Sequence, residues 1–234
     1  MSQSPRPTGP AVEGFVPPPQ PGPARIEGRH VALERLDPAR HAGPVWRAGR
    51  GADWIWDYMG YGPFALAEDY GAWCQGMAPL ADPCFYAIVP AGGEAVGVLA
   101  LLRTDRMNGV TEIGHILMTP PLQQTPAATE AMMLPARWAF GAGYRRFEWK
   151  CDALNAPSRR AALRLGFSFE GVFRQHMIYK GRNRDTAWFS IIDRDWPVLR
   201  AAWDEWLDPA NFDAQGQQRQ SLSDLTARAV PGRV

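Results

Sequence analysis

Two side chains that can exchange protons near neutral pH lie close together in one extended run, Thr111 to Thr119. They are Glu112 and His115, and a positioned carboxylate or imidazole is the usual general base in proton-transfer chemistry. Side chains alternate between the two faces of a regular strand, which places Glu112 on one face, with Gly114, Ile116 and Met118, and His115 on the other. We predict Glu112 as the base. A structural role remains the alternative for each, as an ion-paired carboxylate or a hydrogen-bonded core histidine.

The run stops at Pro120 and Pro121, and the segment "QQTPAATEA" then has the features of a helix start. Thr125 is suited to the N-cap and Pro126 to the first helical position. The backbone N–H groups of the next three residues, Ala127, Ala128 and Thr129, would lack intrahelical partners. The positive end of the helix dipole also attracts anions to this position. The alternative is that Thr125 and water satisfy these N–H groups and that nothing binds.

A second helix start follows in "NAPSRRAALRLGF", where Asn155 is the predicted N-cap and Gly166 the predicted end. The region from Tyr144 to Arg184 contains ten Lys or Arg against three acidic residues, whereas the whole chain has a net charge of +1. This local excess is compatible with an anionic ligand or with a solvated basic surface.

Composition limits the class of protein. The 234 residues are 46% apolar and 21% charged, as in an ordinary globular protein. The near-neutral net charge gives no general attraction to nucleic acid or to an anionic membrane. The three cysteines lack metal-type spacing, and we expect no metal, no membrane span and a cytoplasmic location.

The chain divides into three parts by composition. Residues 1–24 are rich in Pro and Gly, which predicts a flexible tail. We predict one domain over residues 25–207. Residues 208–234 predict a polar tail, with a short helix possible in "SLSDLTARAV". Within the domain, a meander of strands is followed by helix, strand, helix and two further strands. This order predicts an α/β (α+β) fold with helices packed on a mixed sheet.

Four motifs occur along the chain in this order: "EIGHILMTP", "LQQTPAATEA", "NAPSRRAALRLGFSFEGVFRQ" and "GRNRD". Together they resemble the GNAT superfamily of acyl-CoA N-acetyltransferases, over about residues 29–195. Within it they are similar to the ribosomal-protein-alanine acetyltransferase branch. The resemblance implies a mostly antiparallel central sheet and acetyl-CoA as cosubstrate. It also implies direct attack by a primary amine in a ternary complex, the amine being a small molecule or a protein N-terminus, and a monomer or homodimer.

The same resemblance implies roles for individual residues. The strand end should bulge and hold the pantetheine arm through the backbone of Leu117, Met118 and Thr119, aided by Asn155. The phosphates should bind to Gln124, Thr125, Ala127, Ala128, Thr129, Arg159 and Arg160. Ser158 should protonate the departing thiolate. Pro126 replaces the first glycine of the family loop and Ala162 replaces the usual tyrosine acid, so a CoA-sensing module without catalysis is the alternative function.

Two segments are candidates for the acceptor pocket. The aromatic segment "WIWDYMGYGPF" offers Trp54, Trp56, Tyr58 and Tyr61, which could line an apolar or cation-binding site or pack in the core. The hairpin loop "GRNRD" offers Arg182, Asn183 and Asp185, which reach the acceptor or simply form the turn.

Overall fold

The computed structural model describes residues 6–232 and contains one eight-stranded sheet in the order β1-β2-β3-β4-β5-β6-β8-β7. All neighbouring strands are antiparallel except β5 and β6, which are parallel. The mixed, mostly antiparallel sheet confirms the predicted fold class. The strands are β1 (Arg25–Glu27), β2 (Val31–Arg35), β3 (Cys84–Pro90), β4 (Gly97–Asp105), β5 (Val110–Met118), β6 (Arg146–Asp152), β7 (Ser168–Tyr179) and β8 (Arg182–Ile192).

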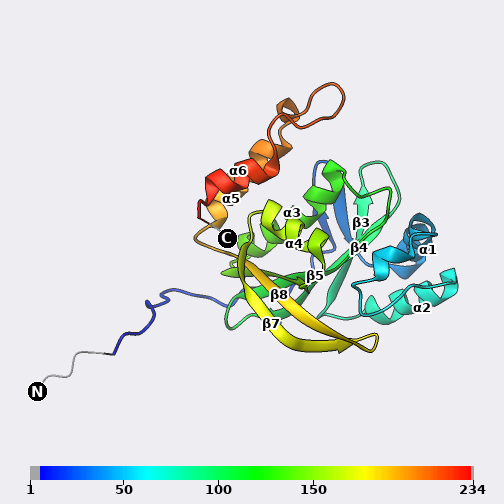
Figure 1. Ribbon diagram of the computed structural model, residues 1–234, viewed down its shortest axis with the longest axis horizontal. Helices are drawn as coiled ribbons and strands as arrows, with labels where there is room; N and C mark the ends of the chain where they lie inside the picture. Colours follow the sequence, from blue (N-terminus) through cyan, green and yellow to red (C-terminus); the bar gives the residue numbers. More distant parts are fainter. Residues whose placement is uncertain (1–5, 233–234) are drawn as a thin grey trace, which may run out of the picture.

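Helices cover the two faces of the sheet unequally (Figure 1). One face packs against α1 (Pro38–Gly49) and α2 (Ala67–Met77) through a core that includes Phe85 and Val98. The other face packs against four helices through a larger core that includes Leu99 and Ile113. These four are α3 (Pro126–Gly141), α4 (Ala156–Arg164), α5 (Trp196–Leu207) and α6 (Leu222–Ala229). Two short 3-10 turns, η1 (Asp53–Trp56) and η2 (Pro209–Asn211), complete the elements.

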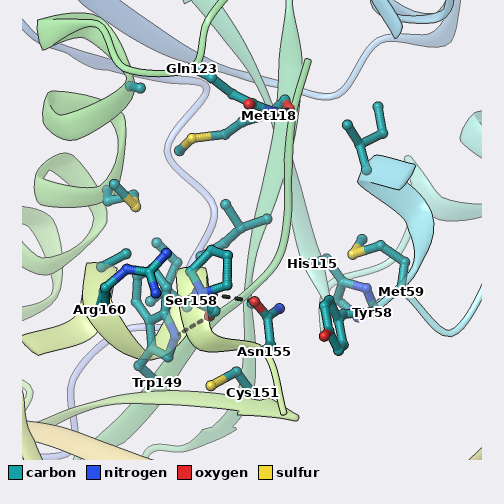
Figure 2. A pocket seen from close by; sticks show the side chains of 18 of the residues that line it. Tyr58, Met59, His115, Met118, Gln123, Trp149, Cys151, Asn155, Ser158 and Arg160 are labelled. Carbon is teal, nitrogen blue, oxygen red and sulfur yellow. Dashed lines mark hydrogen bonds between the residues drawn. The ribbon is translucent and has the colours of Figure 1, made fainter. Parts of the chain in front are cut away.

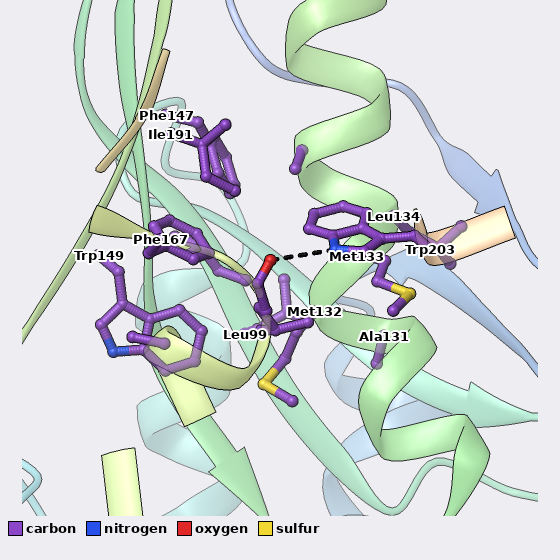
Figure 3. Packing of buried hydrophobic residues seen from close by; sticks show 14 of the residues in the cluster. Leu99, Ala131, Met132, Met133, Leu134, Phe147, Trp149, Phe167, Ile191 and Trp203 are labelled. Atoms are coloured by element: carbon purple, nitrogen blue, oxygen red, sulfur yellow. Dashed lines mark hydrogen bonds between the residues drawn. The ribbon is translucent and has the colours of Figure 1, made fainter. Parts of the chain in front are cut away.

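The larger core is organised around Trp203 of α5, which is fully buried (Figure 3). Its indole N–H donates to the carbonyl oxygen of Leu165 at 3.0 Å, so the only polar atom of the side chain is satisfied. Gly166 follows with a φ of 89°, and a Cβ there would lie 2.4 Å from Leu199 Cδ2. Glycine is therefore required at the predicted end of α4, both for its conformation and for the close approach of α5.

The terminal segments differ from the predicted tails. Beyond 208 the chain folds again, and Leu222 and Leu225 of α6 are buried in the larger core. Near the N-terminus, the carbonyl oxygen of Pro18 accepts a hydrogen bond from Arg106 and that of Pro19 accepts one from the Tyr144 hydroxyl. Polar composition concealed these anchors, because two leucines on one helix face are enough to dock a short helix. The ends of both predicted tails, residues 1–5 and 233–234, lie outside the described residues.

Docking of α6 can be measured by shortening Leu225, which is 3% exposed. Leu225→Ala is expected to lower the free energy of unfolding by about 2–4 kcal/mol, because it removes buried methyl groups and leaves a cavity. Leu163→Ala, at a 45% exposed position of α4, is the control and should change it by less than about 0.5 kcal/mol. Equal, small effects in urea titrations would mean that α6 is undocked in solution.

Candidate active site

A cleft opens where the parallel strands β5 and β6 separate. Their pairing ends at Ile113 with Trp149, after which β5 stays paired only with β4 and β6 only with β8. The cleft has a volume of about 1150 Å³ and is bordered by the starts of α3 and α4, by the η1 region and by the β7–β8 hairpin. Backbone groups along the freed edge of β5 require partners. The separation therefore produces a slot in which an extended ligand can hydrogen-bond to β5.

A β-bulge lies at His115, as the resemblance implied. The φ of His115 is 50°, and the register with β4 shifts between the pairs Ala100–Gly114 and Val98–Leu117. The bulge breaks the side-chain alternation, so the predicted faces are wrong beyond Gly114. His115 contacts Phe85 on the α1–α2 face, which is also the face of Glu112, whereas Ile116 and Met118 pack against the opposite core.

Glu112 lines the cleft but is only 2% exposed. Its carboxylate accepts hydrogen bonds from Arg103 Nη1 at 2.8 and 3.0 Å and from Lys150 Nζ at 2.8 Å. Lys150 also contacts Glu148 at 2.7 Å, and its ammonium lies 3.9 Å from the ring centroid of Trp188. The predicted base is therefore a firmly held carboxylate, and the ion pair named as its alternative role is present as well.

His115 contacts the aromatic wall of the cleft. Its Nδ1 is 3.1 Å from the Tyr61 hydroxyl, and its ring packs against those of Tyr61 and Phe85. Burial, reinforced by the charges of Arg103 and Arg184, lowers the pKa of His115 to about 4. Burial also raises the pKa of Tyr61 far above its ordinary value. Both side chains are thus uncharged at neutral pH.

This shift gives a pH dependence of stability with a defined sign. The ordinary pKa of histidine is 6.5, so between pH 6.5 and 4 the unfolded chain binds a proton at His115 that the folded chain does not. Stability contributed by the neutral ring is complete above this window and is lost as the pH falls through it. His115→Gln is expected to flatten the change in Tm between pH 7 and 4.5 by roughly 5 °C. Parallel Tm profiles for the two proteins would show that His115 is protonated in the folded state.

The start of α3 has the predicted cap, but fewer free donors than predicted. Thr125 Oγ1 accepts from the Ala128 amide at 3.1 Å, and the Thr125 carbonyl oxygen accepts from the Thr129 amide at 3.4 Å. The Thr129 hydroxyl accepts from Arg164. Of the three backbone amides predicted to be free, those of Ala127, Ala128 and Thr129, only the Ala127 amide has no hydrogen-bond partner within residues 6–232. The residues of this stretch that line the cleft are Gln123, Gln124, Thr125, Pro126, Ala128 and Thr129.

The start of α4 is also capped as predicted. Asn155 Oδ1 accepts from the Ser158 amide at 3.0 Å, and the Ser158 hydroxyl oxygen accepts from the Trp149 indole at 3.0 Å (Figure 2). Both side chains line the cleft. The hydroxyl oxygen is the acceptor in this contact, and the Ser158 side chain also forms a hydrogen bond with the Cys151 thiol.

The arginines of α4 are arranged differently from the prediction. Arg160 lines the cleft, but Arg159 does not: its Nη1 donates to the carbonyl oxygen of Ala153 at 3.2 Å, and its guanidinium lies over Phe169. Arg164 also lines the cleft and was not predicted. Its place four residues after Arg160, on the same helix face, is the signal that identifies it.

Of the three strand-end residues predicted to hold the pantetheine arm through their backbone, only Met118 lines the cleft, as does Asn155, which was predicted to aid them. Leu117 is buried in the α1–α2 core beside Val98. Thr119 is also buried, and both its amide and its hydroxyl donate to the carbonyl oxygen of Val96. The bulge and the end of the strand therefore turn Leu117 and Thr119 away from the slot. Ile116, before Leu117, lines it instead.

The aromatic segment divides between wall and core. Trp54, Tyr58 and Tyr61 line the cleft, together with the unpredicted Met59. Trp56 does not; it is 7% exposed and packs edge-on against three aromatic rings of the α1–α2 core. The core alternative is thus correct for Trp56, and Tyr61 packs against the same core while it lines the cleft.

Only Lys180 and Gly181 form the turn of the hairpin, because β8 begins at Arg182, so Arg182, Asn183 and Asp185 belong to the strand and not to a loop as predicted. Asp185 Oδ1 accepts from the Gln175 amide and from the Asn183 side chain, and neither these residues nor Arg182 line the cleft. Arg184 does line it, since it faces the opposite way from Asn183 and Asp185. The tip is fastened to the η1 region by Lys180, whose ammonium donates to the carbonyl oxygen of Trp56 at 2.8 Å.

The cleft offers no activated nucleophile of the thiol type. Cys151 lines it, but burial raises the pKa of this thiol above its ordinary value. Residues 6–232 contain no cluster of three His, Cys, Asp or Glu side chains suited to a metal ion, and no helix long and apolar enough to cross a membrane. The chemistry that the described side chains support is positioning, proton transfer and anion binding.

Comparisons with known proteins agree with this geometry. A model of the acetyltransferase (GNAT) family matches residues 51–167. The crystal structure of a GCN5-related N-acetyltransferase from Brucella melitensis is 43% identical with a TM-score of 0.89, and the match covers 92% of this chain and 99% of that one. The structure of a probable GNAT acetyltransferase from Chromobacterium violaceum ATCC 12472 is 38% identical with a TM-score of 0.77, covering 84% of this chain and all of that one, 100%.

A curated relative is similar over a shorter stretch. The ribosomal-protein-serine acetyltransferase of Escherichia coli (strain K12) is 33% identical over 82 residues, which is 35% of this chain and 46% of the relative. The match thus spans less than half of that protein's length. The family match, the solved structures and the separated strands agree, and the chain belongs to the GNAT family of acetyltransferases.

Proposed function

We propose that this protein transfers the acetyl group of acetyl-CoA to a primary amine by direct attack within a ternary complex. The observation that carries the proposal is the separation of β5 from β6 beside two capped helix starts. The slot suits an extended pantetheine arm, and the helix starts with Arg160 suit its phosphates. Acetyl-CoA supplies the activated thioester, so the chain has to supply position and proton transfer.

The residues facing the slot have complementary proton roles. Glu112, held between two cations, takes the proton of the attacking amine through a water molecule. Ser158 donates its hydroxyl proton to the sulfur as the C–S bond breaks, and the hydroxyl is then reprotonated from solvent. The backbone of the bulge at His115 faces the thioester carbonyl and stabilises charge on its oxygen. The high pKa of the Cys151 thiol argues against a covalent acyl-enzyme.

The acceptor amine enters between the η1 region and the β7–β8 hairpin. Tyr58, Met59 and Tyr61 form one side of this entrance, and Met177 and Tyr179 form the other. The Tyr58 hydroxyl donates to the carbonyl oxygen of Leu154, so the wall is fixed in place. An apolar, aromatic entrance accepts an uncharged amine and can also hold its cation. Both a small amine and a protein N-terminus fit this description.

A second candidate function is coenzyme sensing without turnover. It is favoured by Ala162, which is fully buried and replaces the tyrosine acid of many relatives. The two functions are separated by incubating the protein with acetyl-CoA and a panel of primary amines, amino acid derivatives and peptide N-termini, and measuring free thiol. Thiol release above the rate of hydrolysis supports transfer. A CoA-dependent rise in Tm without release for any amine supports sensing.

Coenzyme binding itself is tested by a matched pair of neighbouring arginines. Arg160→Ala is expected to weaken CoA binding by about 10-fold, because a charge-assisted contact to a phosphate is lost. Arg159→Ala is the control and should bind CoA within about twofold of the unchanged protein, since Arg159 faces away from the cleft. The measurement is calorimetric titration with CoA. No binding by the unchanged protein, or equal losses in both variants, would contradict the proposed placement.

A further inference from the structure

The C-terminal segment supplies part of the lining of the cleft. Trp206, at the end of α5, and the loop that follows it contribute lining residues, namely Phe212, Gly216, Gln217 and Gln218. This segment lies outside residues 51–167, the part that the family model matches.

The loop from Phe212 to Gln218 is held in a fixed shape. The Asn211 side chain is buried, donates to the carbonyl oxygens of Trp206 and Gln220, and accepts from the Gln220 amide. Asp213 Oδ1 accepts from the backbone amides of Gln215 and Gln217. Buried, fully paired groups of this kind hold a loop in one conformation. The side chains that it presents to the cleft are consequently preorganised.

This part of the cleft carries positive charge that is not neutralised. Arg160 and Arg164 line it, and within residues 6–232 neither forms an ion pair with a carboxylate. The Arg164 guanidinium lies 5.1 Å from the ring centroid of Trp206 and donates to the Thr129 hydroxyl at 3.0 Å. The carboxylates that line the cleft belong to other elements: Asp57, Glu112 and Asp152. A half-buried cation without a carboxylate partner indicates an anionic ligand.

Next to this charge are groups suited to a purine base. Gln218 Oε1 accepts from the Trp206 indole at 2.8 Å, which leaves the amide NH₂ of Gln218 free to donate. The Phe212 ring packs edge-on against Trp206 at 5.4 Å and is itself only partly buried. A partly exposed aromatic ring beside amide groups can stack on a base and bond to its edge.

We propose that Arg164 and the C-terminal segment from Trp206 to Gln218 form a subsite for the phosphorylated adenosine end of CoA. This inference rests on the proposed function. It assigns to one further part of the chain the selection of a thioester that carries a nucleotide. Arg164 binds phosphate, and Phe212 and Gln218 hold the base. The acetyl group and the pantetheine arm are bound elsewhere, in the slot beside β5. The segment therefore determines coenzyme affinity and takes no part in proton transfer.

The test compares acetyl-CoA with S-acetyl-pantetheine, which has the same thioester and no nucleotide. Arg164→Gln and Phe212→Ala are each expected to lower kcat/KM for acetyl-CoA by 10-fold or more, mainly through KM, and to leave kcat/KM for S-acetyl-pantetheine within about twofold. Gln215→Ala is the matched control, because Gln215 belongs to the same loop and does not line the cleft. It should behave as the unchanged protein with both thioesters.

Each other outcome overturns the proposal. Equal losses with both thioesters would mean that the segment supports the slot or the fold, and thermal melting of each variant identifies the second case. No loss with acetyl-CoA in either variant would mean that the nucleotide binds away from the segment. Failure of the proposed function is recognised separately, since the unchanged protein would then release no thiol from acetyl-CoA with any amine.

Discussion

Glu112→Gln is expected to lower kcat/KM by about 100-fold or more, the range usual for loss of a general base. The substitution preserves the shape of the side chain and removes its ability to accept a proton. CoA affinity should stay unchanged, because Glu112 lies away from the basic end of the cleft. The deficit should shrink as the pH rises toward the pKa of the amine, since the neutral amine then needs no base. Initial rates across pH 6.5–9.5 provide the measurement.

Glu112 also neutralises the buried Lys150, so an effect on stability must be separated from an effect on rate. Glu148→Gln is the matched control: it removes the other carboxylate partner of the same ammonium, and Glu148 does not line the cleft. Both variants should lose roughly 2–4 kcal/mol of stability, while only the Glu112 variant loses turnover. Normal turnover by Glu112→Gln together with an inactive His115→Gln would assign the base to His115.

Ala128→Glu is expected to weaken CoA binding by about 100-fold or more, while the helix start remains folded. Ala128 is buried as part of the larger core and also lines the cleft, in the first turn of α3. A carboxylate there would occupy the approach to the free end of the helix and repel a pyrophosphate. The sequence would also become Thr-x-x-Glu from Thr125, a capping box, which favours the helix start. Calorimetric titration with CoA and thermal melting without ligand measure the two effects.

Ala128→Ser is the control, because it adds one polar atom and no charge at the same position. It should bind CoA within about threefold of the unchanged protein. If Ala128→Glu binds CoA normally, the pyrophosphate does not approach the start of α3. If both variants lose stability together with CoA binding, the first turn of α3 is too tightly packed for either side chain. The assignment of the pyrophosphate site to the start of α3 then fails, because the loss of binding follows from the loss of the fold.

Local sequence predicted the parts of the site that are governed by local physics. The caps at Thr125 and Asn155 follow from a side-chain oxygen and a backbone amide three residues later, and both are present at 3.0 to 3.1 Å. Pro126 occupies the first helical position for the same local reason. The family was predicted from the order of these motifs and is confirmed by the comparisons.

The rest depended on partners distant in sequence. The bulge at His115 is defined by the register with β4, which the alternation of residues in one strand does not contain. The direction of Arg159 depends on Phe169 of β7, and the burial of Trp56 depends on rings from α2. The contribution of the C-terminal segment to the cleft depends on the Asn211 contacts that hold its loop, in a region whose composition had indicated a tail. The predicted hairpin loop was wrong for a similar reason, since pairing with β7 extends β8 back to Arg182.

The ion pairs around Glu112 extend across the sheet as a continuous row. Arg103, Glu112, Lys150, Glu148, Arg146 and Glu170 follow one another from β4 to β7, with signs that alternate throughout. The row contains as many cations as anions, so at distances beyond a Debye length it presents almost no field. The row itself therefore neither draws a charged molecule to this face from afar nor repels it, and under the proposed function selection among amines would rest on the shape of the aromatic entrance at contact range.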